Sequence, residues 1–228
     1  MNTRAHRPKA VAFDVNETLF DISRLSEVFD GFGLPSISIS WWFAMVLRDG
    51  IALAASGDSA PFGMVAGSAF EELFASLGMN TPTGAVSVLL ETFASLPAHP
   101  DVVSAFELLK EAGIPALALT NGNANVTRGL IERAGVSHLV SQVLSVDEVA
   151  HWKPRPEPYL YAAKQSGVSP DSLALVAVHP WDTHGAKRAG LVAGWLNRNH
   201  RHFPAYFTAP DVEASTLDGV IRLLLQLR

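Results

Sequence analysis

The chain has 228 residues, of which 48% are hydrophobic and 17% are charged, a composition typical of a globular protein with a sizeable apolar core. Its formal net charge of −5 and its lack of a basic run argue against nucleic acid or a membrane surface as the partner. It has no cysteine, which excludes disulfides and thiolate chemistry. The start, Met1–Pro8, lacks the apolar core of a signal peptide, and no apolar segment could span a bilayer, so we expect a cytoplasmic protein.

A short apolar run, Ala10–Phe13, predicts the first strand, because a parallel strand covered on both faces is apolar throughout. Asp14 follows directly, at the carboxyl end of this strand, where open α/β sheets bind their ligands. A buried carboxylate is costly unless it is paired or lies in a site. Thr18 is close enough along the chain to reach the same pocket. The alternative is that Asp14 only caps the helix that follows.

The next part of the chain predicts helices with no strand between them. Apolar residues recur at helical spacing in four segments, 20–29, 41–55, 62–77 and 83–96. We therefore expect a helical cap, residues 21–97, inserted after the first strand and ending near Ala98–Pro100. The flanking residues, 1–20 and 98–228, would form the core domain.

From residue 101 onward, helical and strand patterns alternate. Helices are predicted at 101–112, 124–134, 157–166, 183–189 and 216–227. Strands are predicted at 116–119, 139–145, 173–178 and 192–196. Such alternation favours right-handed crossovers and a mostly parallel sheet with helices on both faces. We expect an α/β protein with a three-layer α/β/α Rossmann-like core.

A hydroxyl and an amide, Thr120 and Asn121, follow the predicted strand 116–119 and precede a helix. Side chains and backbone N–H groups at such a place can hold an anion. The alternative is a plain turn with a helix cap, because Asn-Gly is common in turns.

A lysine, Lys153, stands in the proline-rich segment 151–159. The prolines stiffen the segment and fix the direction in which the lysine points. A lysine held near Asp14 would keep that carboxylate ionised and lower its pKa. The alternative is a surface lysine in a connection between elements.

A second carboxylate, Asp182, lies shortly after the predicted strand 173–178. It could orient water or pair with Lys153, or it could only cap the next helix. Two histidines flank it, His179 and His184. They could be acid–base groups or could merely line the surface.

In this order, the Asp, Thr/Asn, Lys and Asp clusters resemble the four motifs of the haloacid dehalogenase-like hydrolase superfamily. Segments 144–147, 153–159 and 181–186 are most similar to its L-2-haloacid dehalogenases. The resemblance implies hydrolytic dehalogenation of small 2-haloalkanoic acids through an aspartyl ester, with no metal and no cofactor. It also implies a homodimer and a cap that excludes bulk water.

Carried over by position, the resemblance makes Asp14 the nucleophile and gives Lys153 the task of keeping it ionised. Tyr159 and Asp182 would support the site and the hydrolytic water. The residues that would hold the substrate or the attacked carboxylate are Thr18, Thr120 and Asn121.

Two departures argue against a magnesium-dependent phosphatase, which is the first alternative function. Asn16 stands where those enzymes need an acidic group, and an amide cannot donate and regain a proton. The run Val176–Val178 stands where a further carboxylate would help to hold magnesium.

Other departures concern the dehalogenase pattern itself. No arginine occurs around Ser36–Ser40, where those enzymes have one, and Arg48 comes too late to be given its role. His179 replaces an amide and could take over its hydrogen bonds. Trp42 and its aromatic neighbours could line an apolar halide pocket or could be core residues. Glu17 replaces a small residue for no reason that the sequence reveals. Because the arginine is missing, the second alternative function is a catalytically weak protein that binds small carboxylates.

Overall fold

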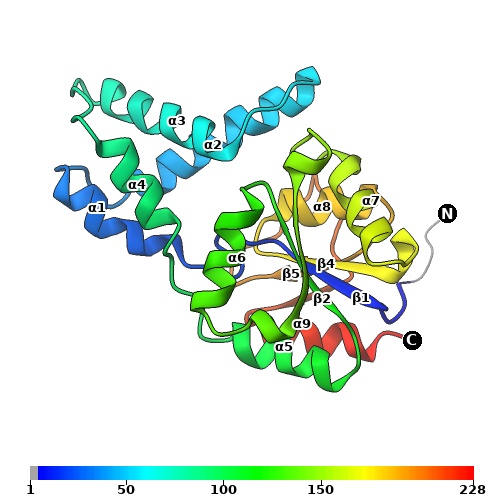
Figure 1. Ribbon diagram of the computed structural model, residues 1–228. Helices are drawn as coiled ribbons and strands as arrows, with labels where there is room; N and C mark the ends of the chain where they lie inside the picture. The colour runs from blue at the N-terminus through cyan, green and yellow to red at the C-terminus, as the bar shows by residue number, and fades with distance from the viewer. Residues whose placement is uncertain (1–4) are drawn as a thin grey trace.

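The computed structural model describes residues 5–228, so the first four residues of the N-terminal segment lie outside it. Its six-stranded sheet has the order β3-β2-β1-β4-β5-β6, and every neighbouring pair is parallel. The strands are β1 (Ala10–Phe13), β2 (Ala116–Thr120), β3 (Val140–Ser145), β4 (Leu173–Ala177), β5 (Val192–Leu196) and β6 (Val212–Ala214). The expected parallel α/β sheet is therefore confirmed (Figure 1).

Helices cover both faces of this sheet. They are α5 (Val102–Glu111), α6 (Ala124–Arg133), α7 (Pro156–Gln165), α8 (Pro180–Arg188) and α9 (Leu217–Gln226). Alternate residues of β1 divide the core: Val11 and Phe13 pack with α5 and α9, whereas Ala10 and Ala12 pack with α7 and α8. Because both faces are covered, β1 is buried at every position, as its apolar sequence predicts.

The expected helical insertion follows β1 and forms a separate lobe beside the sheet (Figure 1). Its helices, which we call the cap, are α1 (Ser26–Gly31), α2 (Ser38–Ser56), α3 (Phe62–Ser76) and α4 (Ala85–Phe93). The chain enters and leaves this lobe side by side, because Phe20 and Ala98 form an antiparallel bridge. Short 3₁₀ turns occur at Ile22–Leu25, Ser137–Leu139, Val146–Glu148 and Pro170–Ser172.

Two predicted elements differ from the structure, and one strand was not predicted. The segment 20–29 is a 3₁₀ turn followed by the short helix α1, rather than one helix. Helix α8 begins at Pro180, where proline is well suited to the first helical position, so Asp182 lies within its first turn. Strand β6 was not predicted, because it has only three residues and none of them is fully buried.

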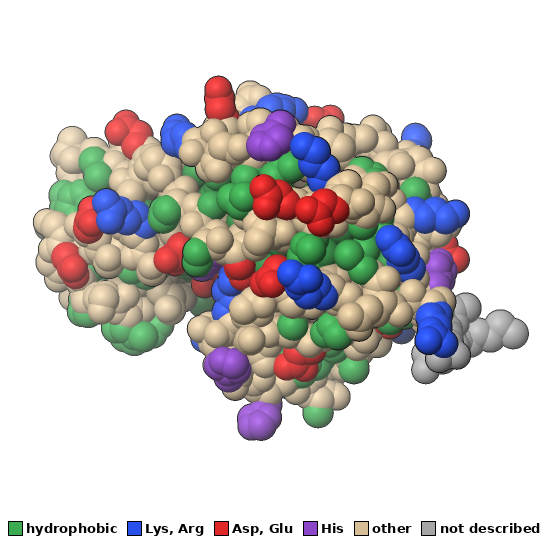
Figure 2. Space-filling model, turned by 90° about the horizontal axis from the view of Figure 1, so that it is seen from below, with side chains coloured by type: hydrophobic (Ala, Val, Ile, Leu, Met, Phe, Trp, Pro, Cys, Tyr) green, Lys and Arg blue, Asp and Glu red, His purple; other side chains and the backbone are tan. Residues whose placement is uncertain are grey.

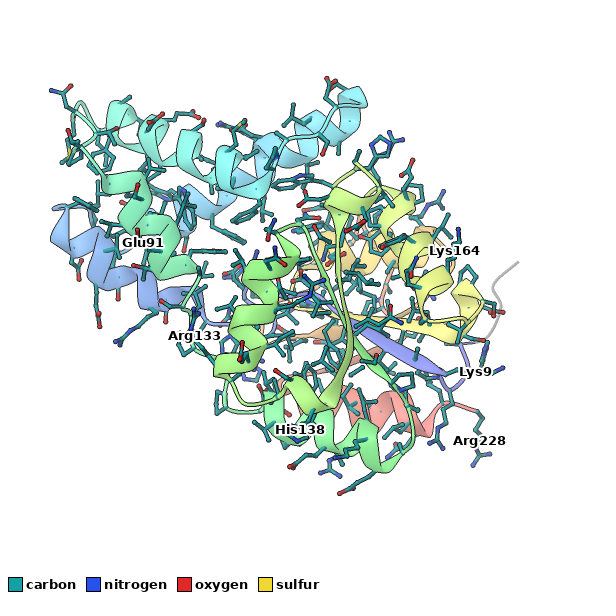
Figure 3. The ribbon with its side chains drawn as sticks, in the orientation of Figure 1. Lys9, Glu91, Arg133, His138, Lys164 and Arg228 are labelled. Carbon is teal, nitrogen blue, oxygen red and sulfur yellow. The ribbon has the colours of Figure 1, made fainter. Side chains whose placement is uncertain are left out.

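The cap and the core are joined through Trp152, which is fully buried. Its indole N–H donates to the carbonyl of Ala60 at 3.0 Å, and its ring stacks on Phe62 of α3 with the centroids 5.9 Å apart. At a second junction, Arg133 of α6 donates to the carbonyl of Ala94, just after α4 (Figure 3). These two contacts come from different elements of the core, so the cap is attached to it at separate places.

The surface carries no extended patch of one charge on the face shown in Figure 2, where acidic and basic side chains are interspersed. Among the described residues, no helix combines the length and the apolar character that crossing a membrane would require.

Candidate active site

The carboxyl edge of the sheet holds Asp14, the first residue after β1. Its backbone N–H donates to the carbonyl of Val176 in the neighbouring strand β4, which fixes the chain at this point. The Thr18 hydroxyl donates to Asp14 Oδ2 at 2.7 Å and accepts the N–H of Val178 at 3.0 Å. Thr18 thereby contacts the Asp14 carboxylate and ties the loop after β1 to the loop after β4.

Lys153 links the two predicted carboxylates. Its Nζ lies 2.8 Å from Asp14 Oδ1 and 2.7 Å from Asp182 Oδ2, and it donates to the carbonyl of Leu119 at 3.1 Å. The ammonium group has three N–H donors, so all of them are used. Its backbone N–H donates to Asn121 Oδ1 at 2.9 Å, which holds the lysine's segment against the loop after β2.

The charges of this cluster support one another. Burial by itself raises the pKa of Asp14, but the charge of Lys153 and the hydrogen bond from His179 outweigh burial and hold that pKa well below its usual range. Burial also opposes the charge on Lys153, yet Asp14 and Asp182 raise the pKa of the lysine. At neutral pH, Asp14 is therefore an ionised carboxylate in a site from which water is largely excluded.

Asp182 receives a second partner from helix α7. The Tyr159 hydroxyl donates to Asp182 Oδ1 at 2.6 Å, and burial raises the pKa of Tyr159 well above its ordinary value, so it stays a donor. Burial and the charge of Asp14 raise the pKa of Asp182, against the opposing effect of Lys153. A Cβ on Gly185 would lie 2.5 Å from the tyrosine hydroxyl, so only glycine allows α8 to approach this closely.

Glu17 and His179 form a pair that sequence reasoning missed. His179 Nδ1 lies 3.1 Å from Asp14 Oδ2, and its Nε2 lies 2.9 Å from Glu17 Oε2. Burial lowers the pKa of His179, but the hydrogen bonds to the two carboxylates raise it to about 10. The backbone of Glu17 has a φ of 61°, a left-handed conformation that is strained for a residue with a side chain. The sequence contained one sign of this pair: both residues differ from those that the resembled dehalogenases have at these positions.

Thr120 and Asn121 lie around the cluster and do not touch Asp14. The Thr120 hydroxyl accepts the N–H of Gly122 at 2.8 Å, and the carbonyl of Gly122 accepts from Ser145. With the bond from Asn121 to Lys153, these contacts fix the loop after β2. Thr120 nevertheless lies close to the cap, because it lines a cavity between the cap and the core.

The predicted substrate-binding residue Trp42 does not reach the carboxylate cluster. It is fully buried in the cap, where its indole N–H donates to the carbonyl of Ala66 at 2.9 Å. Consecutive residues of a helix point in different directions, so the next residue, Phe43, faces the core instead. The Phe43 ring centroid lies 6.1 Å from that of His179, and Trp181 covers the same imidazole at 5.2 Å.

The cap supplies no arginine to the site. Arg48 lies on the exposed side of α2, where it pairs with Asp49 at 2.7 Å and with Glu72 at 2.9 Å. His184, the other histidine of this region, accepts the N–H of Thr208 at 3.0 Å and is not part of the cluster. Within residues 5–228, no group of three or more histidine and carboxylate side chains has a geometry that could hold a metal ion.

A cavity of about 150 Å³ lies between the cap and the core. Asn16 and Thr120 lie at its core side, and Phe62, Leu90 and Phe93 form its cap side. Its lining is mostly apolar, and one of its lining residues, Asn16, comes two positions after Asp14 in the chain. Its size and its apolar lining suit a small substrate with an apolar part, beside the loop that follows Asp14.

Comparison with known proteins agrees with this geometry. A family model described as a haloacid dehalogenase-like hydrolase matches residues 8–190. (S)-2-haloacid dehalogenase 1 of Pseudomonas sp. (strain CBS-3) is 28% identical over 221 residues, which cover 96% of this chain and 97% of that protein. The structure of the L-2-haloacid dehalogenase RSc1362 has a TM-score of 0.87 at 28% identity and covers 97% of this chain and 99% of its own. An L-2-haloacid dehalogenase from Xanthobacter autotrophicus with chloropropionic acid covalently bound shares the fold, with a TM-score of 0.89, 22% identity and coverage of 97% and 100%.

Proposed function

The chain belongs to the haloacid dehalogenase-like hydrolase family, and we propose that it cleaves the carbon–halogen bond of small 2-haloalkanoic acids through an ester on Asp14. The observation that carries this proposal is the bridge that Lys153 makes between two buried carboxylates, at 2.8 Å from Asp14 and 2.7 Å from Asp182. It keeps Asp14 ionised in a dry site, as a carboxylate nucleophile requires. The names of the similar proteins give the substrate class.

In the first step, one oxygen of Asp14 attacks the carbon that bears the halogen. A C–O bond forms, the carbon–halogen bond breaks, and the halide leaves with the bonding electrons. Asp14 Oδ1 is held by the fully buried Lys153, whereas Oδ2 contacts Thr18 and the partly exposed His179. We therefore assign the attack to Oδ2.

In the second step, water attacks the ester carbonyl carbon of Asp14 and releases a 2-hydroxy acid. Negative charge develops on Oδ1, and the ammonium group of Lys153 already lies within hydrogen-bond distance of it. Tyr159 and Asp182 hold Lys153 in this position. Neither step requires a metal ion, because the lysine supplies the positive charge.

The carboxylate of the substrate needs a partner other than the missing cap arginine. The backbone N–H groups of Val15 and Asn16 follow Asp14 directly, and within residues 5–228 no protein group accepts a hydrogen bond from them. Such neighbouring N–H groups at the carboxyl edge of a sheet suit an anion. We propose that they hold the substrate carboxylate and so take the place of the arginine.

Three expectations from the sequence belong to this proposal. They are the division into a cap of residues 21–97 and a core of 1–20 and 98–228, a homodimer, and a cytoplasmic location. The division is supported by the separate lobe that α1–α4 form. The homodimer rests on the family resemblance, and size-exclusion chromatography with light scattering tests it.

The decisive assay is halide release from chlorinated, brominated and fluorinated acetates and from both 2-chloropropionate enantiomers, in the presence of EDTA. We expect turnover that survives chelation and prefers the (S)-enantiomer. Phosphate release from a phosphate ester on addition of magnesium, without halide release, would assign the protein to the phosphatases instead. Ligand-induced thermal stabilisation without either turnover would indicate a binding protein.

A further inference from the structure

We infer that His179, oriented by Glu17, is the general base for the water that hydrolyses the Asp14 ester. This inference rests on the proposed function and adds a catalytic residue to it. The imidazole lies between the two carboxylates, with Nδ1 3.1 Å from Asp14 Oδ2 and Nε2 2.9 Å from Glu17 Oε2. It is the group that contacts the reacting oxygen and can also take up a proton near neutral pH.

Ester formation changes the charge that faces His179. In the free enzyme, two carboxylates hold the imidazole in its protonated form. When Oδ2 becomes an ester oxygen, Asp14 loses its charge and one of these two partners is lost. The pKa of His179 then falls from about 10 towards its ordinary value, and the ring can lose its Nδ1 proton to solvent. This is the proton that accompanies the departing halide.

The neutral imidazole is then placed for the second step. Its Nδ1 takes a proton from water as the water oxygen attacks the Asp14 carbonyl carbon. The tetrahedral intermediate collapses with cleavage of its bond to the substrate oxygen, which keeps the second water proton as the hydroxyl of the product. Asp14 returns as a carboxylate and His179 as an imidazolium, so the resting state is restored and atoms and charges balance.

Glu17 fixes which nitrogen faces the ester. Its bond to Nε2 keeps a proton on that nitrogen in the neutral ring, so Nδ1 is the free base. The left-handed backbone of Glu17 aims the side chain at the imidazole, and His99 Nε2 contacts the Glu17 carbonyl at 3.1 Å and holds the loop. The strained backbone of Glu17 thus serves to place its carboxylate against the imidazole of His179.

The charged groups around His179 come from two directions. Asp14 and Glu17 face it from the loop after β1, and Lys153 and Asp182 lie behind Asp14. The cap faces it with the uncharged ring of Phe43. Since the charges of Lys153 and Asp182 oppose each other, Glu17 is the group that sets the proton affinity of His179 in the ester.

The test is rapid-quench halide release with 2-chloropropionate by wild type and His179→Asn, with mass spectrometry of the Asp14 peptide. We expect the variant to release one halide per active site at a normal rate and then to turn over about 100-fold or more slowly, with the alkyl group on Asp14. Asparagine can still donate to Asp14 but cannot take up a proton. His138→Asn, at an exposed histidine far from the site, is the matched control and should behave as wild type (Figure 3).

A second variant, Glu17→Gln, tests the orienting role by the pH profile of kcat. Hydrolysis requires neutral His179, so kcat should rise with pH, and loss of the Glu17 charge should move this rise to lower pH. An unmoved profile would overturn the role of Glu17. An unchanged kcat in His179→Asn, or an equally slowed halide burst, would overturn the general base. If wild type releases no halide at all, the proposed function itself fails.

Discussion

At the scale of single residues, the site depends on one lysine in the interior. Lys153 is fully buried and neutralises charge on Asp14 and Asp182, which are themselves buried. Such a group is costly to transfer from water, so its neighbours must compensate for it. The nucleophile Asp14 and the charge of Lys153 therefore depend on each other in the folded protein. A variant of Asp14 should affect activity alone, whereas a variant of Lys153 should affect both activity and stability.

Asp14→Asn should abolish turnover and leave the fold intact. The amide is nearly the same size, and Lys153 keeps its bond to Asp182 at 2.7 Å. An amide cannot form the ester, so we expect a loss of about 10⁴-fold or more in halide release. Circular dichroism and a thermal melt would confirm the fold, and a variant with full activity would refute covalent catalysis.

Lys153→Met should destabilise the protein as well as inactivate it. It leaves the buried Asp182 without a cation and Asp14 with only the imidazolium of His179, at a cost of about 3–5 kcal/mol in the free energy of unfolding. The control is Lys164→Met on the exposed side of α7, which should change that free energy by less than about 0.5 kcal/mol (Figure 3). If both substitutions changed the free energy of unfolding equally, the buried bridge would contribute nothing specific to stability.

The residues that sequence reasoning placed at the site share a simple signal. Asp14, Thr18 and Asn121 follow apolar strands, and parallel strands bring their carboxyl ends to one edge. His179 shares this signal, because it follows the strand predicted at 173–178, but its contact with Glu17 does not, because the two residues are separated by 162 positions and meet only through loop geometry. Trp42 was misplaced for a similar reason, since sequence does not decide which aromatic residue of a helix faces the core.

At the scale of elements, the junction between cap and core explains a glycine inside helix α2. A Cβ on Gly50 would lie 2.1 Å from ring atoms of Trp152, which is fully buried. The helix accepts a residue of low propensity because the indole needs this space. Elements of strong periodicity were predicted well, whereas the start of α8 and the short strand β6 were not, because proline and three half-exposed residues give weak periodic signals.

Gly50→Ala should destabilise the protein, although alanine favours helices by about 1 kcal/mol. The indole must move, which disturbs its stacking on Phe62 and its hydrogen bond to Ala60. Gly129→Ala in α6 is the matched control: its Cβ would meet only Arg133, at 4.0 Å, so it should be neutral or stabilising. Urea unfolding distinguishes the two, and a more stable Gly50→Ala protein would contradict this account of the junction.

At the scale of the whole molecule, stability should depend on pH through His179. Folding raises its pKa from 6.5 to about 10, so its contribution to stability is complete below pH 6.5 and is lost as pH rises through 10. Between these values, wild type should lose on the order of 5 kcal/mol relative to His179→Asn. Urea unfolding at several pH values measures this difference, and parallel curves for the two proteins would show that the imidazole gains no proton affinity on folding.

The central claim is that Asp14 carries the reaction as an ester, and isotope transfer from H₂¹⁸O tests it most directly. After many turnovers of a 2-haloalkanoic acid, mass spectrometry would measure ¹⁸O in the peptide that contains Asp14. We predict label in the Asp14 carboxylate, because water attacks its carbonyl carbon and the former carboxylate oxygen leaves with the product. Label in the product alone, with Asp14 unlabelled, would show direct attack of water on the substrate and contradict the covalent mechanism.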